Sequence, residues 1–141
     1  MEPRSPITFA VLAFIAGFIA TVVFHQSMVA LLDAAGLMPA AIKPWSFDPV
    51  PPLAVPAVIS KAFWGGLWAI LLGFLLRNAS GAGYWLSWTL LGAVALSLVA
   101  IFVVPVLKGQ PVPGFMERFP VYALVNAAWG FGAALLLKLL R

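Results

Sequence analysis

The hydrophobic positions along the chain fall into four long and nearly unbroken stretches. A bilayer core takes about 20 apolar residues of helix, and the stretches cover about 7–32, 56–76, 84–104 and 119–140. Inside lipid the backbone must satisfy its own hydrogen bonds, so each stretch predicts a membrane-spanning helix. The pattern therefore predicts an all-α, polytopic membrane protein, a four-transmembrane-helix bundle in which residues 1–141 form a single transmembrane domain.

Proline and glycine separate these stretches. Residues 34–55 combine five prolines with two aromatic side chains, which is typical of a stiff, amphipathic loop on the membrane surface. Pro56 and Pro120 are expected near helix starts, where a missing N–H does no harm. Pro105 is expected to close the third helix, and residues 77–83 predict a tight polar turn.

The charges give a weak indication of orientation. An even number of helices places both termini on one side of the membrane. The terminal side carries four basic residues, namely Arg4, Arg77, Lys138 and Arg141. The other side carries three, with a fourth close to it: Lys43, Lys108, Arg118 and Lys61. Three acids near the second side, Asp33, Asp48 and Glu117, agree with cytoplasmic termini. We expect a multi-pass protein of the bacterial inner membrane with both termini in the cytoplasm.

The amino-acid composition supports a membrane location and indicates which kinds of partner the protein contacts. The chain is 64% hydrophobic and 9% charged, whereas soluble domains carry about 25% charged residues. Its surface must therefore face lipid or other proteins. The net charge of +4 comes from scattered basic residues, so we expect contact with anionic headgroups of the lipid bilayer and no nucleic acid. The absence of cysteine excludes disulfides and thiolate chemistry.

The second and fourth stretches resemble each other. Pro-Val-Pro occurs at 49–51 and again at 111–113, and residues 61–65 (Lys-Ala-Phe-Trp-Gly) match 126–130 (Asn-Ala-Ala-Trp-Gly). From there the two helices align without a gap until their ends. Shared composition is one explanation, since Leu, Ala and Gly dominate both, but the joint recurrence of Trp-Gly and Pro-Val-Pro favours a true duplication. The alternative hypothesis is an internal repeat of two helical hairpins related by an axis along the membrane normal.

A few polar and aromatic residues could form a binding site. Polar groups inside a membrane are expensive and often functional. Counted along the helices, these side chains reach similar depths near the loop-rich face, and together they could line a cavity that opens toward it. The candidate ligand-binding residues are His25, Gln26, Lys61, Trp64, Tyr122, Asn126 and Trp129.

Each candidate also has a purely structural explanation. Lys61 could extend its stem to the headgroups instead of binding an anionic or carbonyl group. Asn126 could cross-link helices, and Trp64 and Trp129 could anchor the membrane interface. His25 is the single histidine; it suits a helix-end hydrogen bond first and a proton relay second.

The sequence contains no nucleophile with a base, no phosphate-binding glycine loop and no metal-ligand spacing. We therefore expect no catalytic residues, no metal and no cofactor, and an enzyme is the least supported class. Two functions remain. The first is an accessory or assembly subunit of a larger membrane complex, with protein partner subunits or a homo-oligomer. The alternative is a small transporter or ligand-binding membrane protein that uses a polar cavity between helices 1, 2 and 4.

Overall fold

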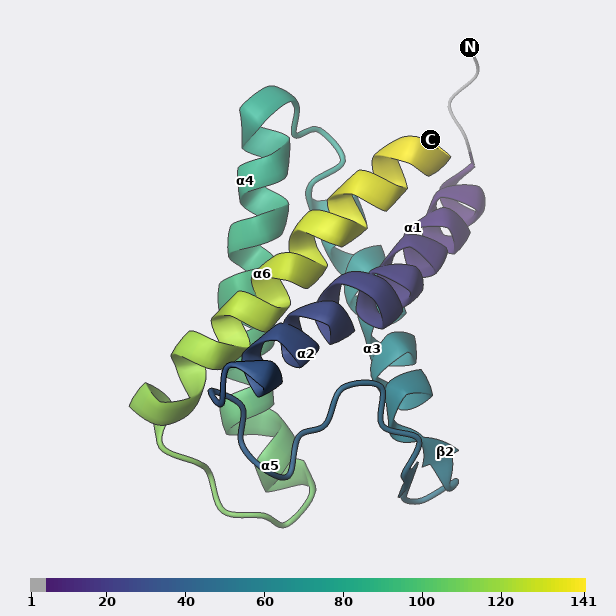
Figure 1. The fold of residues 1–141 in the computed structure, drawn as a ribbon. Helices are drawn as coiled ribbons and strands as arrows, with labels where there is room; N and C mark the ends of the chain where they lie inside the picture. The colour runs from purple at the N-terminus through teal and green to yellow at the C-terminus, as the bar shows by residue number, and fades with distance from the viewer. Residues whose placement is uncertain (1–4) are drawn as a thin grey trace.

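The computed structural model describes residues 5–141 and confirms an all-α fold with four helices long and apolar enough to cross a membrane (Figure 1). These helices cover Pro6–Ala34, Ala57–Leu75, Gly81–Leu107 and Phe115–Leu140. The start of the first helix and the end of the fourth lie at one end of the bundle, as expected for an even number of spans (Figure 1). Arg4, which entered the orientation argument, lies outside the described residues.

The first spanning helix consists of three segments: α1 (Pro6–Ala20), the π-helical turn η1 (Thr21–His25) and α2 (Gln26–Ala34). Its start is set by Ser5, whose Oγ accepts a hydrogen bond from the Thr8 N–H at 3.1 Å, followed by a proline in the first turn. A π turn widens the helix by one residue and loosens its hydrogen-bond ladder. The helix runs two residues past the predicted end.

The predicted loop 34–55 is more ordered than expected. It contains the short strand β1 (Pro49–Val50), which pairs antiparallel with β2 (Val55–Pro56). The second strand leads directly into α3 (Ala57–Leu75), and Pro56 occupies the N-cap position of that helix. The loop therefore ends in a hydrogen-bonded β-hairpin, and the second spanning helix follows it directly.

The third spanning helix begins with α4 (Gly81–Leu91), continues through η2 (Gly92–Leu96) and η3 (Val99–Val103), and ends with α5 (Val104–Leu107). The prediction that Pro105 closes this helix was wrong, because the helix continues to Leu107. The π turn just before α5 already interrupts the α-helical hydrogen-bond register. A missing N–H at this junction therefore removes little that a regular helix would have made.

The fourth spanning helix, α6 (Phe115–Leu140), begins four residues earlier than predicted and contains Pro120 in its second turn. The added turn is apolar: Phe115 stacks on Phe119 at 4.8 Å between ring centroids and on Phe102 at 6.0 Å. Glu117 lies in this first turn, where a carboxylate interacts favourably with the helix dipole.

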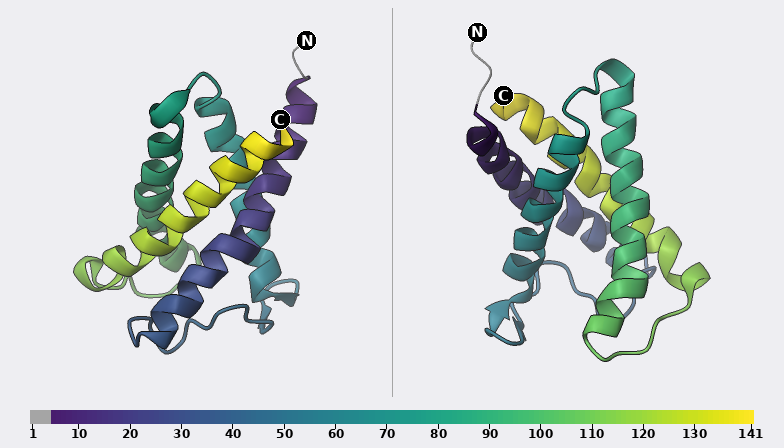
Figure 2. Two further views of the ribbon diagram at one scale, coloured as in Figure 1. Left: turned by 45° about the horizontal axis from the view of Figure 1, so that its top comes forward. Right: turned by 180° about the vertical axis from the view of Figure 1, so that it is seen from behind.

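The helices pack as two hairpins joined through a central pair. Helix α1 packs on α3, α6 packs on α4 and η2, and the first spanning helix runs alongside α6 in the centre (Figures 1 and 2). Small buried side chains line these contacts and let the backbones approach closely; they include Ala13, Ala16, Ala20, Ala69, Ala133 and Ala134.

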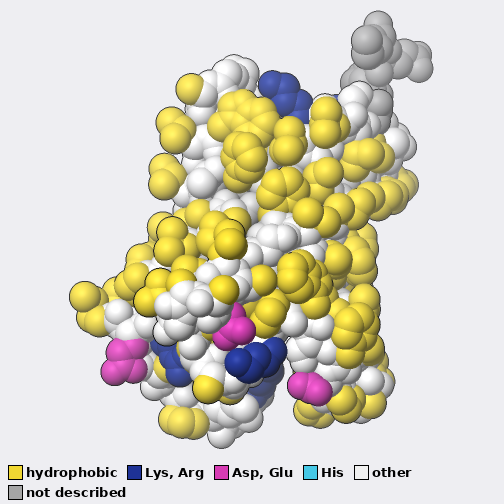
Figure 3. Space-filling view, in the orientation of Figure 1, with side chains coloured by type: hydrophobic (Ala, Val, Ile, Leu, Met, Phe, Trp, Pro, Cys, Tyr) yellow, Lys and Arg dark blue, Asp and Glu magenta, His cyan; other side chains and the backbone are white. Residues whose placement is uncertain are grey.

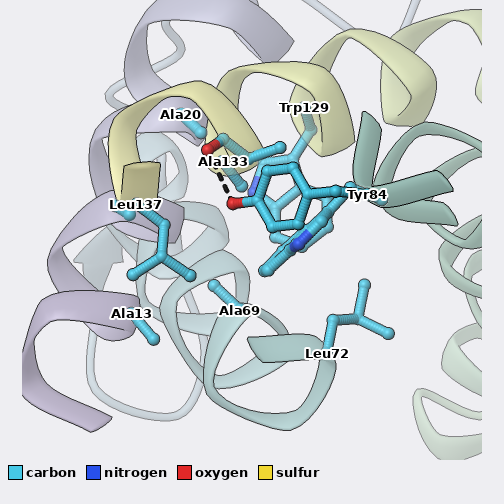
Figure 4. Close-up of a cluster of buried hydrophobic side chains, with 11 residues drawn as sticks. Ala13, Ala20, Ala69, Leu72, Tyr84, Trp129, Ala133 and Leu137 are labelled. Atoms are coloured by element: carbon cyan, nitrogen blue, oxygen red, sulfur yellow. Dashed lines mark hydrogen bonds between the residues drawn. The ribbon is translucent and has the colours of Figure 1, made fainter. Parts of the chain in front are cut away.

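The outer helices α3 and α4 make few backbone contacts with each other within the described residues. Tyr84 and Trp88 of α4 fill the space near the terminal end of the bundle, where they join Ala69, Leu72 and Trp129 in one buried cluster (Figure 4). Apolar side chains cover much of the outside of the molecule (Figure 3). This surface suits lipid or a protein partner.

Candidate functional site

The seven candidate residues occupy three different environments. Gln26, Asn126 and Trp129 are buried between helices; His25 and Tyr122 are half-buried; Lys61 and Trp64 are exposed. Two of the surface hollows in the described part of the chain have linings that contain none of these residues. One is apolar and lies between the first two helices, and the other lies at the terminal end between α4 and the end of α6.

Gln26 fastens the long loop to the first helix. Its Oε1 accepts a hydrogen bond from the Trp45 backbone N–H at 2.7 Å, which fixes the orientation of the amide. Its Nε2 lies 3.1 Å from His25 Nδ1 and can only donate, so Nδ1 must accept. The neutral imidazole of His25 therefore carries its proton on Nε2.

Trp45 makes a second contact with the first helix. Its indole Nε1 donates to the Val22 carbonyl at 2.8 Å, inside the π turn η1. Trp45 has φ 46°, a left-handed conformation that few non-glycine residues adopt, and these two hydrogen bonds hold it there. A third link joins the same elements, since Lys43 pairs with Asp33 at 3.4 Å. The loop is therefore tied to helix 1 at several points.

Asn126 cross-links the second hairpin. Its Nδ2 donates to Ser97 Oγ at 3.0 Å, and both side chains are buried. Ser97 lies between η2 and η3 of the third spanning helix. This contact matches the structural explanation considered for Asn126, a hydrogen bond between helices inside the membrane.

Trp129 joins the two hairpins. Its Nε1 donates to the Gly17 carbonyl at 3.1 Å, and that oxygen also accepts from Thr21 Oγ1 at 2.9 Å. The Trp129 side chain is 1% exposed, whereas Trp64, its counterpart in the sequence repeat, is 60% exposed. Trp129 therefore packs inside the bundle, whereas Trp64 lies on the surface of the molecule.

Lys61 stands apart from the other candidates. Its side chain makes no hydrogen bond or ion pair with any residue from 5 to 141, and it lies within electrostatic range of His25 and Lys108. The turn η1, which carries His25, packs against α3, which carries Lys61. The two side chains therefore lie on neighbouring elements, within electrostatic range of each other. Tyr122 lies on α6, one turn before Asn126.

The glycines of the two Trp-Gly pairs make equivalent contacts in the two hairpins. A Cβ on Gly65 would collide with Thr21 and approach the Gly17 carbonyl, and a Cβ on Gly130 would collide with the Trp88 carbonyl. One turn after each of these carbonyls a π turn begins, at Thr21 in the first hairpin and at Gly92 in the second.

The correspondence extends to the residue after each of these π turns. Gln26 directly follows η1, Ser97 directly follows η2, and both side chains are buried and polar. Ser97 binds Asn126, the residue aligned with Lys61. Lys61 corresponds to Asn126 in the sequence alignment, but no hydrogen bond joins Lys61 to Gln26 within residues 5–141.

Several contributing residues were not among the sequence candidates. Gly17 accepts from Trp129, Ser97 accepts from Asn126, and Tyr84 donates from its hydroxyl to the Ala134 carbonyl at 2.8 Å (Figure 4). Ser97 is a polar residue within a long apolar stretch, so its position could have identified it. Gly17 gives no such signal, because every residue has a backbone carbonyl, and which one meets a tryptophan of another helix depends on how the helices pack.

Trp88 is also buried, and its Nε1 has no hydrogen-bond partner in the part of the chain that the structure describes. Within residues 5–141, no three His, Asp or Glu side chains come together in a way that could hold a metal ion. No protein family, curated protein or solved structure matches the chain.

Proposed function

We propose that this protein is an accessory or assembly subunit of a larger membrane complex. One observation carries the proposal: the exposed face of α3 around Trp64. Most of the other candidate groups are engaged inside the fold. Gln26 holds the loop, Asn126 binds Ser97, and Trp129 binds the Gly17 carbonyl. A subunit whose polar groups mainly stabilise its own fold can contribute apolar surfaces for assembly.

The contrast between Trp64 and Trp129 supports a protein partner at α3. Both are followed by a glycine that packs on the preceding helix of its hairpin. The Trp129 indole also hydrogen-bonds to the Gly17 carbonyl of α1. The Trp64 side chain makes no such bond within residues 5–141 and remains exposed. We infer that a partner helix carrying Gly or Ala covers Trp64 in the assembled complex, as α1 covers Trp129 within the chain.

This interpretation includes the internal repeat. The proposed hairpins are α1–α3 and α4–α6, and their matching glycine contacts and π turns support a duplication. The proposed location is the bacterial inner membrane with both termini in the cytoplasm. The four spans support a multi-pass protein, and the basic residues of the terminal side support this orientation.

Crosslinking in intact membranes tests the subunit role. A photo-crosslinking amino acid at Trp64 should yield a discrete adduct with a second polypeptide, and stoichiometric partners should co-purify in mild detergent. Leu86 provides the matched control, because it lies on α4 and is 59% exposed; the same probe there should label mainly lipid. Lipid adducts alone at both positions, together with a monodisperse homo-oligomer, would contradict the proposal.

A second candidate is a small transporter or ligand-binding protein. The unpartnered Lys61 beside His25 favours it, because a charge at this depth needs water or a counterion. Under this alternative, the purified protein should be a homo-oligomer without other subunits. It should also move or bind a solute in liposomes, and Lys61→Met should abolish that activity.

A further inference from the structure

The two hairpins carry polar residues at corresponding places. Within residues 5–141, these residues hydrogen-bond to each other in the second hairpin but not in the first. In the second hairpin, Asn126 and Ser97 satisfy each other. In the first hairpin, the corresponding residues are Lys61 and Gln26, and Gln26 is occupied by Trp45 and His25. The Lys61 ammonium is therefore left without a partner among residues 5–141.

The polar groups that remain near Lys61 are hydrogen-bond donors. Because Gln26 Nε2 donates to His25 Nδ1, the proton of His25 lies on Nε2, and this N–H has no hydrogen-bond partner among the described residues. Lys61 contributes three further donors. Lys108 adds a second positive charge within electrostatic range of Lys61. A group that satisfies such a set must be an acceptor, and a negatively charged one is favoured most.

Within residues 5–141, no acidic side chain accepts a hydrogen bond from Lys61 or forms an ion pair with it. Asp33 pairs with Lys43, and Asp48 accepts from Ser46 Oγ at 3.0 Å. Glu117 lies on the first turn of α6, beside Gly114. Asp33, Asp48 and Glu117 therefore do not supply a counterion for Lys61, and a ligand could.

The position of Lys61 along α3 indicates which kind of anionic ligand it can bind. It lies in the second turn of α3, about 6 Å along the helix from its first residue, at the end of the bundle that carries the long loop. At this end α3 and α5 diverge (Figures 1 and 2), and charged side chains gather there on the face shown in Figure 3. A lysine one turn inside the end of a spanning helix can extend its stem to the phospholipid phosphates at the bilayer surface.

We propose that Lys61 and His25 form a phosphate-binding site that takes the headgroup of an anionic phospholipid from the leaflet on the loop side. The Lys61 ammonium contacts the phosphate oxygens and the His25 Nε2–H donates to one of them. Basic positions between membrane helices bind anionic headgroups in this way. The site goes beyond the proposed subunit role and is tested without any partner protein.

The test measures retained and added lipid on the purified full-length chain. Native mass spectrometry in mild detergent should show one phosphatidylglycerol per chain that resists delipidation. Lys61→Met should weaken its binding about tenfold, the loss expected for one charge-assisted hydrogen bond. Lys138→Met, which removes an equal charge at the opposite end, should leave it unchanged. His25→Met should reduce retention, and His25→Gln, which keeps an N–H donor, should restore part of it.

Two further measurements separate the sources of phosphate and the effects on folding. Phosphatidylglycerol in nanodiscs should raise the melting temperature of wild type but not of Lys61→Met, and inorganic phosphate should have no effect. A response to inorganic phosphate that Lys61→Met abolishes would assign the site to a soluble anion and overturn the lipid proposal. Equal retention in Lys61→Met and wild type, or equal loss in Lys138→Met, would overturn the site. If Lys61→Met does not fold, Lys61→Gln provides the same comparison.

Discussion

Replacement of Gly130 by alanine should destabilise the protein strongly, because this glycine lets two spanning helices touch through their backbones. An added Cβ would collide with the Trp88 carbonyl oxygen and would lie 3.0 Å from the Trp88 carbonyl carbon and 3.2 Å from Thr89 Cα. All three atoms belong to the backbone of α4, so no side-chain rotation relieves the contact. Helices α4 and α6 would have to separate by about 1 Å to restore normal spacing.

The expected magnitude follows from two effects. Overpacking of a close contact costs about 1–3 kcal/mol. Separation also stretches the hydrogen bonds on either side, between Tyr84 and Ala134 at 2.8 Å and between Asn126 and Ser97 at 3.0 Å. Such bonds in membrane proteins are worth about 0.6–2 kcal/mol each. Loss of one of them brings the total for Gly130→Ala to about 2–5 kcal/mol.

Reversible unfolding in mixed micelles, followed by tryptophan fluorescence, measures this change. Gly83→Ala is the matched control, because Gly83 also lies on α4 and its added Cβ would meet no atom within 4 Å. The control should change the free energy of unfolding by no more than about 0.5 kcal/mol. If Gly130→Ala also falls within that range, the described contact between α4 and α6 is not the close backbone approach we infer.

Three further predictions concern the polar contacts and the topology. A double-mutant cycle of Asn126→Ala and Ser97→Ala should give a coupling energy of about 0.6–1.7 kcal/mol; a coupling of zero would contradict their hydrogen bond. Gln26→Leu should leave the helices intact but release the loop at Trp45, so hydrogen exchange of the Trp45 amide should rise sharply; unchanged protection would contradict the tether. Cysteine at Ser46 should react with an impermeant reagent in intact cells and cysteine at Ser80 should not, and the reverse pattern would overturn the proposed orientation.

The number and extent of the spanning helices could be predicted from the sequence because lipid imposes one requirement on every span. A hydrophobic stretch of sufficient length must form a helix in a bilayer. The boundaries were less predictable where proline was the guide. Pro105 follows a π turn, and Pro120 lies in the second turn of α6, so both lie inside helices and neither marks a boundary.

The use of individual polar residues could not be predicted from the sequence in the same way. Gln26 and Lys61 look equally available along the chain, but Gln26 is taken by a loop residue 19 positions away. Trp64 and Trp129 share a local motif, and their exposure differs because only Trp129 meets another helix of the chain. These differences depend on which helices pack against each other. The hydrophobic pattern of a single helix does not predict its neighbours.

The carbonyl of Gly17 has a consequence for the order in which the molecule is completed. It receives Thr21, one turn away, and Trp129 from the last spanning helix. During synthesis the first hairpin can insert and close on its own, since Gly17, Thr21 and Gly65 all belong to it. Its indole partner emerges only after nearly the whole chain has been made. The Gly17 carbonyl of the amino-terminal half therefore first accepts from the backbone N–H and the hydroxyl of Thr21 alone, and the arrival of the final helix adds the Trp129 indole as a third donor.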